Sequence, residues 1–159
     1  MKIKLNEGSH ASDFDIDTLQ KKVGVPLTPE FLEFVRNNDG SKPETNIFKV
    51  NESIESGVNG FIPVRLIIRE MSNIENLPEN AFPVAWAEGG NYIFIDQGIG
   101  GSVYFWDHEQ PENIFKLADG FSQFIDLIDP FDTGSIKLKP NQVKKAWIDP
   151  DFLKTIQST

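Results

Sequence analysis

The chain has 159 residues, of which 39% are hydrophobic and 11% aromatic, so a folded domain is expected rather than a disordered chain. It contains no cysteine, which excludes disulfide bonds, thiolate catalysis and metal sites with sulfur ligands. The formal net charge is −9, and an acidic surface disfavours DNA, RNA and anionic lipid as partners.

Two short helices are predicted near the N-terminus. Apolar side chains recur three and four positions apart over residues 16–23, and Gly24 follows them as a C-terminal cap. A second helix is predicted to begin with Thr28 as its N-cap and Pro29 in its first turn. The Asn-Asp-Gly sequence at 38–40 is expected to end it.

The next part of the chain is polar and rich in turn-forming residues, and its elements are short. Residues 47–50 are a strand candidate. Residues 61–68 are apolar and β-branched, which predicts another strand, with Pro63 favouring a sheet edge or an interruption. Residues 70–80 are expected to form a loop or a short irregular helix.

The most hydrophobic part of the chain predicts the centre of a sheet. Residues 82–87 lead into a turn at 88–91, and residues 92–95 form a strand that is apolar on both faces, as central strands are. A glycine-rich connection then leads to a strand at 103–106, which predicts an antiparallel hairpin. Eleven of the eighteen aromatic residues lie within 82–131, so this segment is expected to supply most of the core.

A third set of helices is predicted towards the C-terminus. Asp119 is placed to cap a helix whose apolar side chains at 121–128 follow helical spacing, and the Asp-Pro pair at 129–130 ends it. Two further short helices are predicted at 141–147 and 149–156. The order of elements predicts an α+β fold: a single domain with a largely antiparallel central sheet flanked by N- and C-terminal helices.

Four segments resemble one known family, in its order and with similar spacing. Residues 24–40 combine a helix end, a Val-Pro-Leu step and a Pro-Glu-Phe-Leu-Glu-Phe helix start, and residues 58–62 are Val-Asn-Gly-Phe-Ile. Residues 82–109 hold the two core strands, and residues 117–124 are Leu-Ala-Asp-Gly-Phe-Ser-Gln-Phe. Together they cover roughly residues 16–130, and they resemble the SUKH superfamily, which groups bacterial immunity proteins with a fungal regulator of cell-wall synthesis.

The resemblance implies a fold and a role. It implies one SUKH-like domain over residues 1–159, with residues 135–159 as a basic helical extension packed on it. It also implies an immunity protein that binds and neutralises a cognate polymorphic or contact-dependent toxin. The alternative is a non-enzymatic regulatory scaffold that binds host proteins, as the fungal relative does. One departure is Asp39, which stands where the family usually has glycine.

The charge is unevenly distributed and suggests how such a protein could act. Residues 1–134 hold 22 acidic against 10 basic side chains, whereas residues 135–159 hold five lysines against two aspartates. Solubility alone would explain this charge, but an acidic surface could also cover the basic substrate site of a toxin such as a nuclease. The candidate partner-binding residues are the acids near predicted loops or strand ends: Glu70, Glu75, Glu79, Glu88, Asp96, Asp107, Glu109 and Glu112.

Catalytic and cofactor sites are not expected. Asp107 and His108 could form a general-base pair, but no nucleophile or further ligand accompanies them, and His10 lies in an unpatterned segment. A structural or interface role is predicted instead, with Asp107 capping the turn after its strand. The glycines within 98–101 lack the lysine and hydroxyl of a phosphate loop, so a hairpin turn is predicted there. The tryptophans are expected in the core: Trp86, Trp106 and Trp147.

The remaining expectations concern location and assembly. The N-terminus lacks the apolar stretch of a secretory signal, and no run approaches the roughly 18 apolar residues of a membrane span. We therefore expect a cytoplasmic protein with a cognate toxin as its partner, with neither nucleic acid nor membrane bound, and with no metal or cofactor. It is expected to be a monomer or a weak homodimer.

Overall fold

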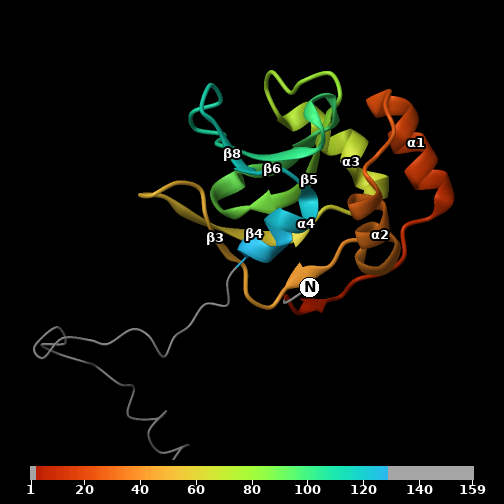
Figure 1. The fold of residues 1–159 in the computed structure, drawn as a ribbon, viewed down its shortest axis with the longest axis horizontal. Helices are drawn as coiled ribbons and strands as arrows, with labels where there is room; N and C mark the ends of the chain where they lie inside the picture. Colours follow the sequence, from red (N-terminus) through yellow and green to blue (C-terminus); the bar gives the residue numbers. More distant parts are fainter. Residues whose placement is uncertain (1–2, 129–159) are drawn as a thin grey trace, which may run out of the picture.

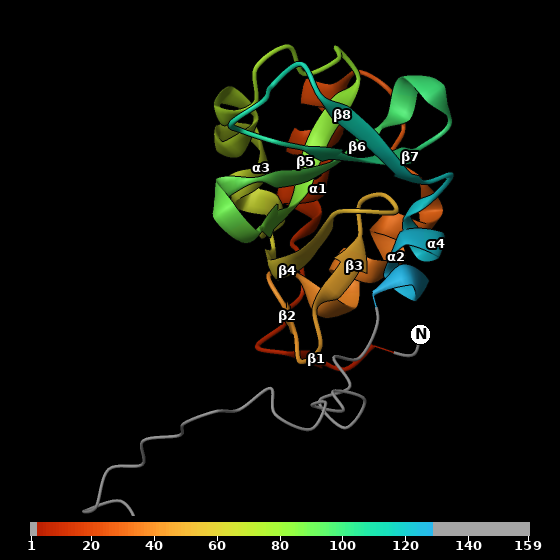
Figure 2. The same cartoon turned by 90° about the vertical axis from the view of Figure 1, so that its left-hand side faces the viewer.

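Six strands form one antiparallel sheet in the computed structural model, which describes residues 3–128. The strands follow each other across the sheet in chain order, so each pairs with its sequence neighbours. Figure 2 shows the sheet twisting from β3 and β4, low in the view, to β6–β8 above them. The strands are β3 (Ile47–Lys49), β4 (Glu55–Phe61), β5 (Ala81–Ala87), β6 (Tyr92–Asp96), β7 (Ser102–Trp106) and β8 (Ile114–Ala118).

Four α-helices and a small ladder accompany the sheet. The α1 and α3 helices contact each other, and α2 contacts α4 (Figure 1). A separate two-stranded ladder joins β1 (Leu5–Asn6) to β2 (Lys42–Pro43). The helices are α1 (Asp13–Val23), α2 (Pro29–Asn38), α3 (Val64–Glu70) and α4 (Phe121–Leu127), with 3₁₀ turns η1 (Met71–Asn73), η2 (Glu88–Gly90) and η3 (Gln97–Ile99).

A cluster of phenylalanine rings joins the helices to the sheet. The ring of Phe31 in α2 lies 5.1 Å from that of Phe82 in β5 and 5.5 Å from that of Phe121 in α4. Phe124 reaches across to Phe48 in β3, at 5.7 Å between ring centres. Tilted and edge-to-face pairs at these distances add to the stability that burial of the rings provides. This cluster holds α2 and α4 side by side over the sheet.

The predicted fold class is confirmed, and so are several of its elements. Gly24 ends α1 with a φ of 82°, and Pro29 begins α2. The β6 strand is central and buried along its whole length, and β6 and β7 form the expected hairpin. Thr28 occupies the N-cap position of α2, although its side chain makes no capping hydrogen bond.

The prediction of a strand over residues 61–68 is wrong. The strand ends at Phe61, and α3 begins at Val64, directly after Pro63. The side chain of Asp39 caps this helix, because its Oδ1 accepts the Val64 N–H at 2.8 Å. Asp39, at the position where the resemblance leads one to expect glycine, therefore stabilises α3. The β-branched residues of this helix had favoured a strand prediction.

Two smaller differences lie near the end of the sheet. The sequence did not predict β8, which is an edge strand of the sheet. Its apolar pattern is interrupted by Lys116, whose side chain is on the exposed side of the strand. Asp119 is not the cap of α4, since Gly120 occupies that position and the Asp119 N–H donates to Gln123 Oε1 at 2.8 Å.

The prediction of two C-terminal helices, and of a basic extension packed on the domain at 135–159, lies outside the described residues, as does Trp147. Within residues 3–128, no helix has both the length and the apolar character that crossing a membrane requires.

Candidate partner-binding surface

The structure divides the eight predicted acidic residues into three groups. Glu88 and Asp107 line one shallow hollow at the end of the sheet. Two others are buried, Glu70 with 6% and Asp96 with 9% of its surface exposed. Four are exposed and lie outside the hollow: Glu75, Glu79, Glu109 and Glu112.

The hollow has a volume of about 220 Å³ and lies between the ends of β4, β5, β7 and β8. Glu55, at the first position of β4, lines it together with Glu88 and Asp107. We call these three carboxylates the acidic rim. Sequence analysis missed Glu55, because nothing in a polar, turn-rich segment indicates that it lies beside a turn more than thirty residues further along the chain.

A glycine in β4 makes room for the side chain of Glu88. A Cβ atom added at Gly57 would lie 2.8 Å from Cδ and Oε1 of Glu88, which is closer than real contacts allow. The glutamate therefore lies over the backbone of the neighbouring strand, while its residue as a whole remains exposed. Gly57 thus positions Glu88 beside Glu55, two residues before it in β4.

Hydrogen bonds hold the third carboxylate in place. Asp107 Oδ1 accepts the Glu109 N–H at 2.9 Å, which confirms its predicted role in capping the turn after the strand. Asn91 Oδ1 accepts the His108 N–H at 3.0 Å and also lies 2.9 Å from the ring Nδ1. The segment that follows β7 is therefore fastened to the turn that follows β5.

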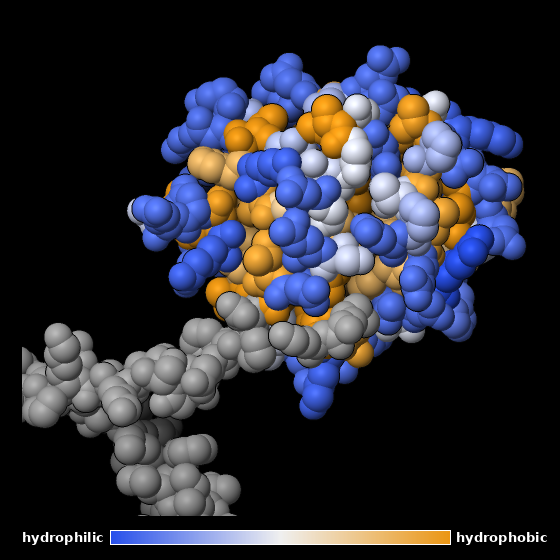
Figure 3. Space-filling view, in the orientation of Figure 1, coloured by the Kyte–Doolittle hydropathy of each residue, from blue (hydrophilic) through white to orange (hydrophobic). Residues whose placement is uncertain are grey.

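Apolar side chains line the same hollow. Phe105 and the half-buried Phe115 contribute, and Ile54 is 44% exposed at its edge. In the orientation of Figure 1, hydrophobic side chains reach the surface in separate clusters among hydrophilic ones (Figure 3). A basic side chain could place its aliphatic stem against such a wall and its charge near the carboxylates.

Glu70 serves the fold rather than the surface. Its Oε2 accepts hydrogen bonds from Trp86 Nε1 at 3.0 Å and from the Tyr92 hydroxyl at 2.8 Å, and its Oε1 accepts two from the Arg69 guanidinium. Burial alone would raise the pKa of this carboxyl, but the three donors outweigh burial and hold the pKa below its usual value. Burial and the hydrogen bond to Glu70 raise the pKa of the Tyr92 hydroxyl.

Asp96 also belongs to the framework. Its Oδ1 accepts the Gly98 N–H at 2.9 Å, which begins the turn between β6 and β7. Gly100 and Gly101 continue this turn with φ values of 80° and 84°, so the hairpin prediction for these glycines is confirmed. The burial of Asp96 removes it from any surface that a partner could touch.

The arrangement around the histidines does not assemble a catalytic group. His108 is exposed and bonded to Asn91, whereas His10 bonds to the carbonyl of Arg36 in α2. Within residues 3–128, no group of three or more His, Asp or Glu side chains could hold a metal ion. What the acidic rim offers chemically is a pre-formed surface for a cationic group.

Comparison with known proteins identifies a family whose model matches most of the chain. The family model described as SMI1 / KNR4 family (SUKH-1) matches residues 10–127. A curated relative, the SPbeta prophage-derived uncharacterized protein YokK of Bacillus subtilis (strain 168), is 35% identical over 54 residues. This alignment covers 32% of the chain and only 28% of the relative's own length.

Proposed function

Because the chain belongs to the SMI1/KNR4 family (SUKH-1), whose members generally have immunity or regulatory roles without enzymatic activity, we propose that it is an immunity protein for a cognate toxin. In this proposal it acts in the cytoplasm of the cell it protects. The acidic rim docks on the basic active site of the toxin and blocks the substrate. A nuclease is the toxin class that this surface fits best, because a nuclease must attract a polyanion.

The observation that carries the proposal is the acidic rim itself. Glu55, Glu88 and Asp107 come from three separate parts of the chain and surround a hollow with an apolar wall. Fixed carboxylates can steer a basic partner and speed its association, and the apolar wall can slow its dissociation. The side chain of Ile54, which is 44% exposed at the edge of the hollow, adds to the apolar surface available for contact.

Co-expression with the toxin domain of the neighbouring gene tests the role. We expect growth to be rescued and a one-to-one complex to co-purify. If the chain neither rescues growth nor co-purifies with that domain, the immunity proposal is wrong, and a regulatory role remains.

A matched pair of charge reversals tests the surface. Glu88→Lys introduces a positive charge in the acidic rim, whereas Glu79→Lys makes the same change at an exposed acid outside it. We expect weaker protection from the first variant and unchanged protection from the second. Equal protection by the two variants would remove the acidic rim from the interface while leaving the immunity role intact.

A further inference from the structure

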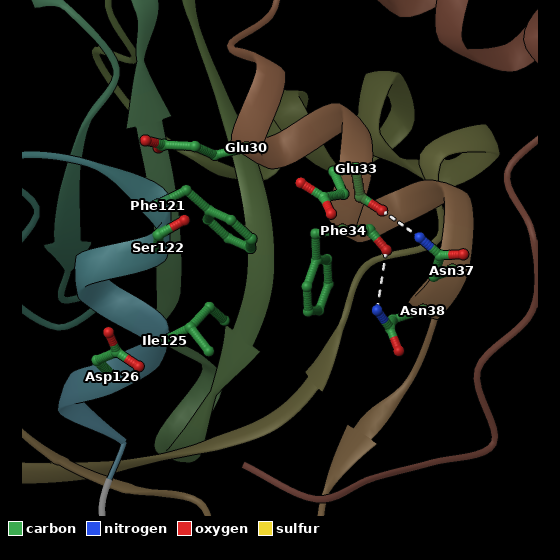
Figure 4. A pocket seen from close by; sticks show the side chains of 9 residues that line it. All are labelled: Glu30, Glu33, Phe34, Asn37, Asn38, Phe121, Ser122, Ile125 and Asp126. Atoms are coloured by element: carbon green, nitrogen blue, oxygen red, sulfur yellow. Dashed lines mark hydrogen bonds between the residues drawn. The ribbon is translucent and has the colours of Figure 1, made fainter. Parts of the chain in front are cut away.

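A second hollow lies between two helices and is larger than the first. It has a volume of about 370 Å³ and is formed by α2 and α4. Figure 4 shows Phe34 on α2 facing Phe121 and Ile125 on α4, so the floor of the hollow is apolar. The acidic side chains of Glu30, Glu33 and Asp126 lie at its edges. We call this hollow the α2–α4 groove, and the lining residues that matter here are Glu30, Glu33, Phe34, Phe121, Ile125 and Asp126.

The carboxylates of the groove have no cationic partner within the described part of the chain. None of the salt bridges formed among residues 3–128 includes Glu30, Glu33 or Asp126. The amides beside them are already used, because Asn37 and Asn38 donate to the carbonyls of Glu33 and Phe34 at 2.9 and 3.2 Å (Figure 4). The groove therefore offers an apolar floor with uncompensated negative charge along its edges.

The rest of the chain starts next to this groove. The α4 helix ends at Leu127, and Ile128 is both its C-cap and the last described residue. The twelve residues of 129–140 can span up to about 40 Å when extended, whereas the seven residues of α4 are only about 10 Å long. Residues beyond 140 can therefore reach any point along the groove.

The sequence beyond residue 140 has the complementary chemistry. Residues 141–147 are Asn-Gln-Val-Lys-Lys-Ala-Trp, in which two adjacent lysines lie among apolar side chains. We propose that this segment docks in the α2–α4 groove of its own chain. Trp147 packs against the apolar floor, and Lys144 and Lys145 lie near the acidic edges.

Covalent attachment favours this occupant over a separate molecule. A segment joined to its site through a short stretch of the same chain has an effective concentration on the order of millimolar, so even a weak contact is occupied. Docking would also satisfy the negative charge of the groove and leave the acidic rim as the free acidic surface. Docking in the groove is independent of what binds the acidic rim.

Engineered cysteines test the position of the segment in the full chain. The natural sequence has no cysteine, so a pair introduced by substitution can form only one intramolecular disulfide. Ser122 is exposed at the edge of the groove, and the test variant combines Ser122→Cys with Ala146→Cys. The matched control combines Ala146→Cys with Ser53→Cys, an exposed position next to Ile54, which lines the hollow that the acidic rim surrounds.

We expect the intramolecular disulfide to form at least ten times faster in the Ser122→Cys pair than in the control, as followed by gel mobility after adding oxidised glutathione. Equal rates would contradict docking in the groove. A faster reaction of the Ser53→Cys pair would place the segment at the acidic rim instead. Disulfide-linked dimers in place of the intramolecular product would show that the groove binds a second copy.

A charge exchange separates docking from a general effect on the fold. Glu33→Lys, added to the Ser122→Cys pair, should slow the disulfide several-fold by placing like charges together. Lys145→Glu should restore the rate in the Glu33→Lys background, because it recreates opposite charges. If the exchange fails to restore the rate while the melting temperature stays normal, the proposed charge pairing is wrong.

Discussion

Two glutamates near the same strand show how differently one kind of charge can be used. Glu70 ends α3 and accepts hydrogen bonds from Trp86 of β5 and Tyr92 of β6, with only 6% of its surface exposed. Glu88 directly follows β5, and its exposed side chain lies over Gly57 at the acidic rim. The first carboxylate is part of the fold, whereas the second is available to a partner.

The difference shows that net charge by itself does not define an interaction surface. A carboxylate that accepts several hydrogen bonds has already exchanged its water for protein donors, so it has little left to offer a partner. An exposed carboxylate keeps its water and its long-range field, which is what steers association. This division predicts that substitutions at buried side chains change stability, whereas substitutions at the acidic rim change binding.

The core that supports both regions should be the most sensitive. Phe124 is fully buried in α4 and packs against Phe48. Phe124→Ala should lower the free energy of unfolding by about 3–5 kcal/mol, because a buried ring is replaced by a cavity. Chemical denaturation measures this, and protection should fall as folded protein is depleted. A loss below 1 kcal/mol would show that the ring cluster does not hold α4 in place.

The buried glutamate should come next. Glu70→Ala removes the acceptor of Trp86 and Tyr92 and should cost about 1.5–3 kcal/mol of stability. Glu88→Ala is the matched control and should stay within about 0.5 kcal/mol of the natural chain, since its side chain is exposed. Equal effects of the two substitutions in a denaturation experiment would contradict the division between them.

The contribution of Glu70 should depend on pH in one direction. Its folded-state pKa is lowered, so the unfolded chain binds a proton first as pH falls. The stability that the ionised group provides is therefore complete above its usual pKa of 4.5 and disappears as pH falls through the lower folded-state pKa. The stability gap between the natural chain and Glu70→Gln should shrink over this range. A gap that widens in acid would contradict the lowered pKa.

The smallest effect is expected at the exposed histidine. His108→Ala removes a ring that bonds to Asn91 at the surface, so stability should change by no more than about 0.5–1.5 kcal/mol. Protection in a growth assay should stay within a few-fold, because the proposed immunity role gives the imidazole no chemistry to perform. A variant that folds and binds normally but no longer protects would instead indicate catalysis.

Local sequence patterns were sufficient to predict the elements that have a typical capping residue or a continuous apolar run. The Gly24 cap, the Pro29 helix start and the apolar β6 strand are all visible in short windows of sequence. The α3 helix was hidden because its β-branched residues favour strands locally, and its cap comes from Asp39 in a distant part of the chain.

The site was predictable only in part, for the same physical reason. Glu88 and Asp107 follow strands, where exposed turns are common, and both line the hollow. The burial of Glu70 depends on donors sixteen and twenty-two positions away, and the contribution of Glu55 depends on strand pairing across Gly57. Such contacts between distant residues have no signature in one sequence.

The most direct test of the account is the association rate with the cognate toxin, measured by stopped flow for Glu88→Lys and Glu79→Lys at low salt and at 1 M salt. At low salt, Glu88→Lys should associate at least fivefold more slowly than Glu79→Lys. The difference should nearly vanish at 1 M salt, where the screening length is about 3 Å. Equal rates for the two variants at low salt would contradict the claim that the acidic rim is the docking surface.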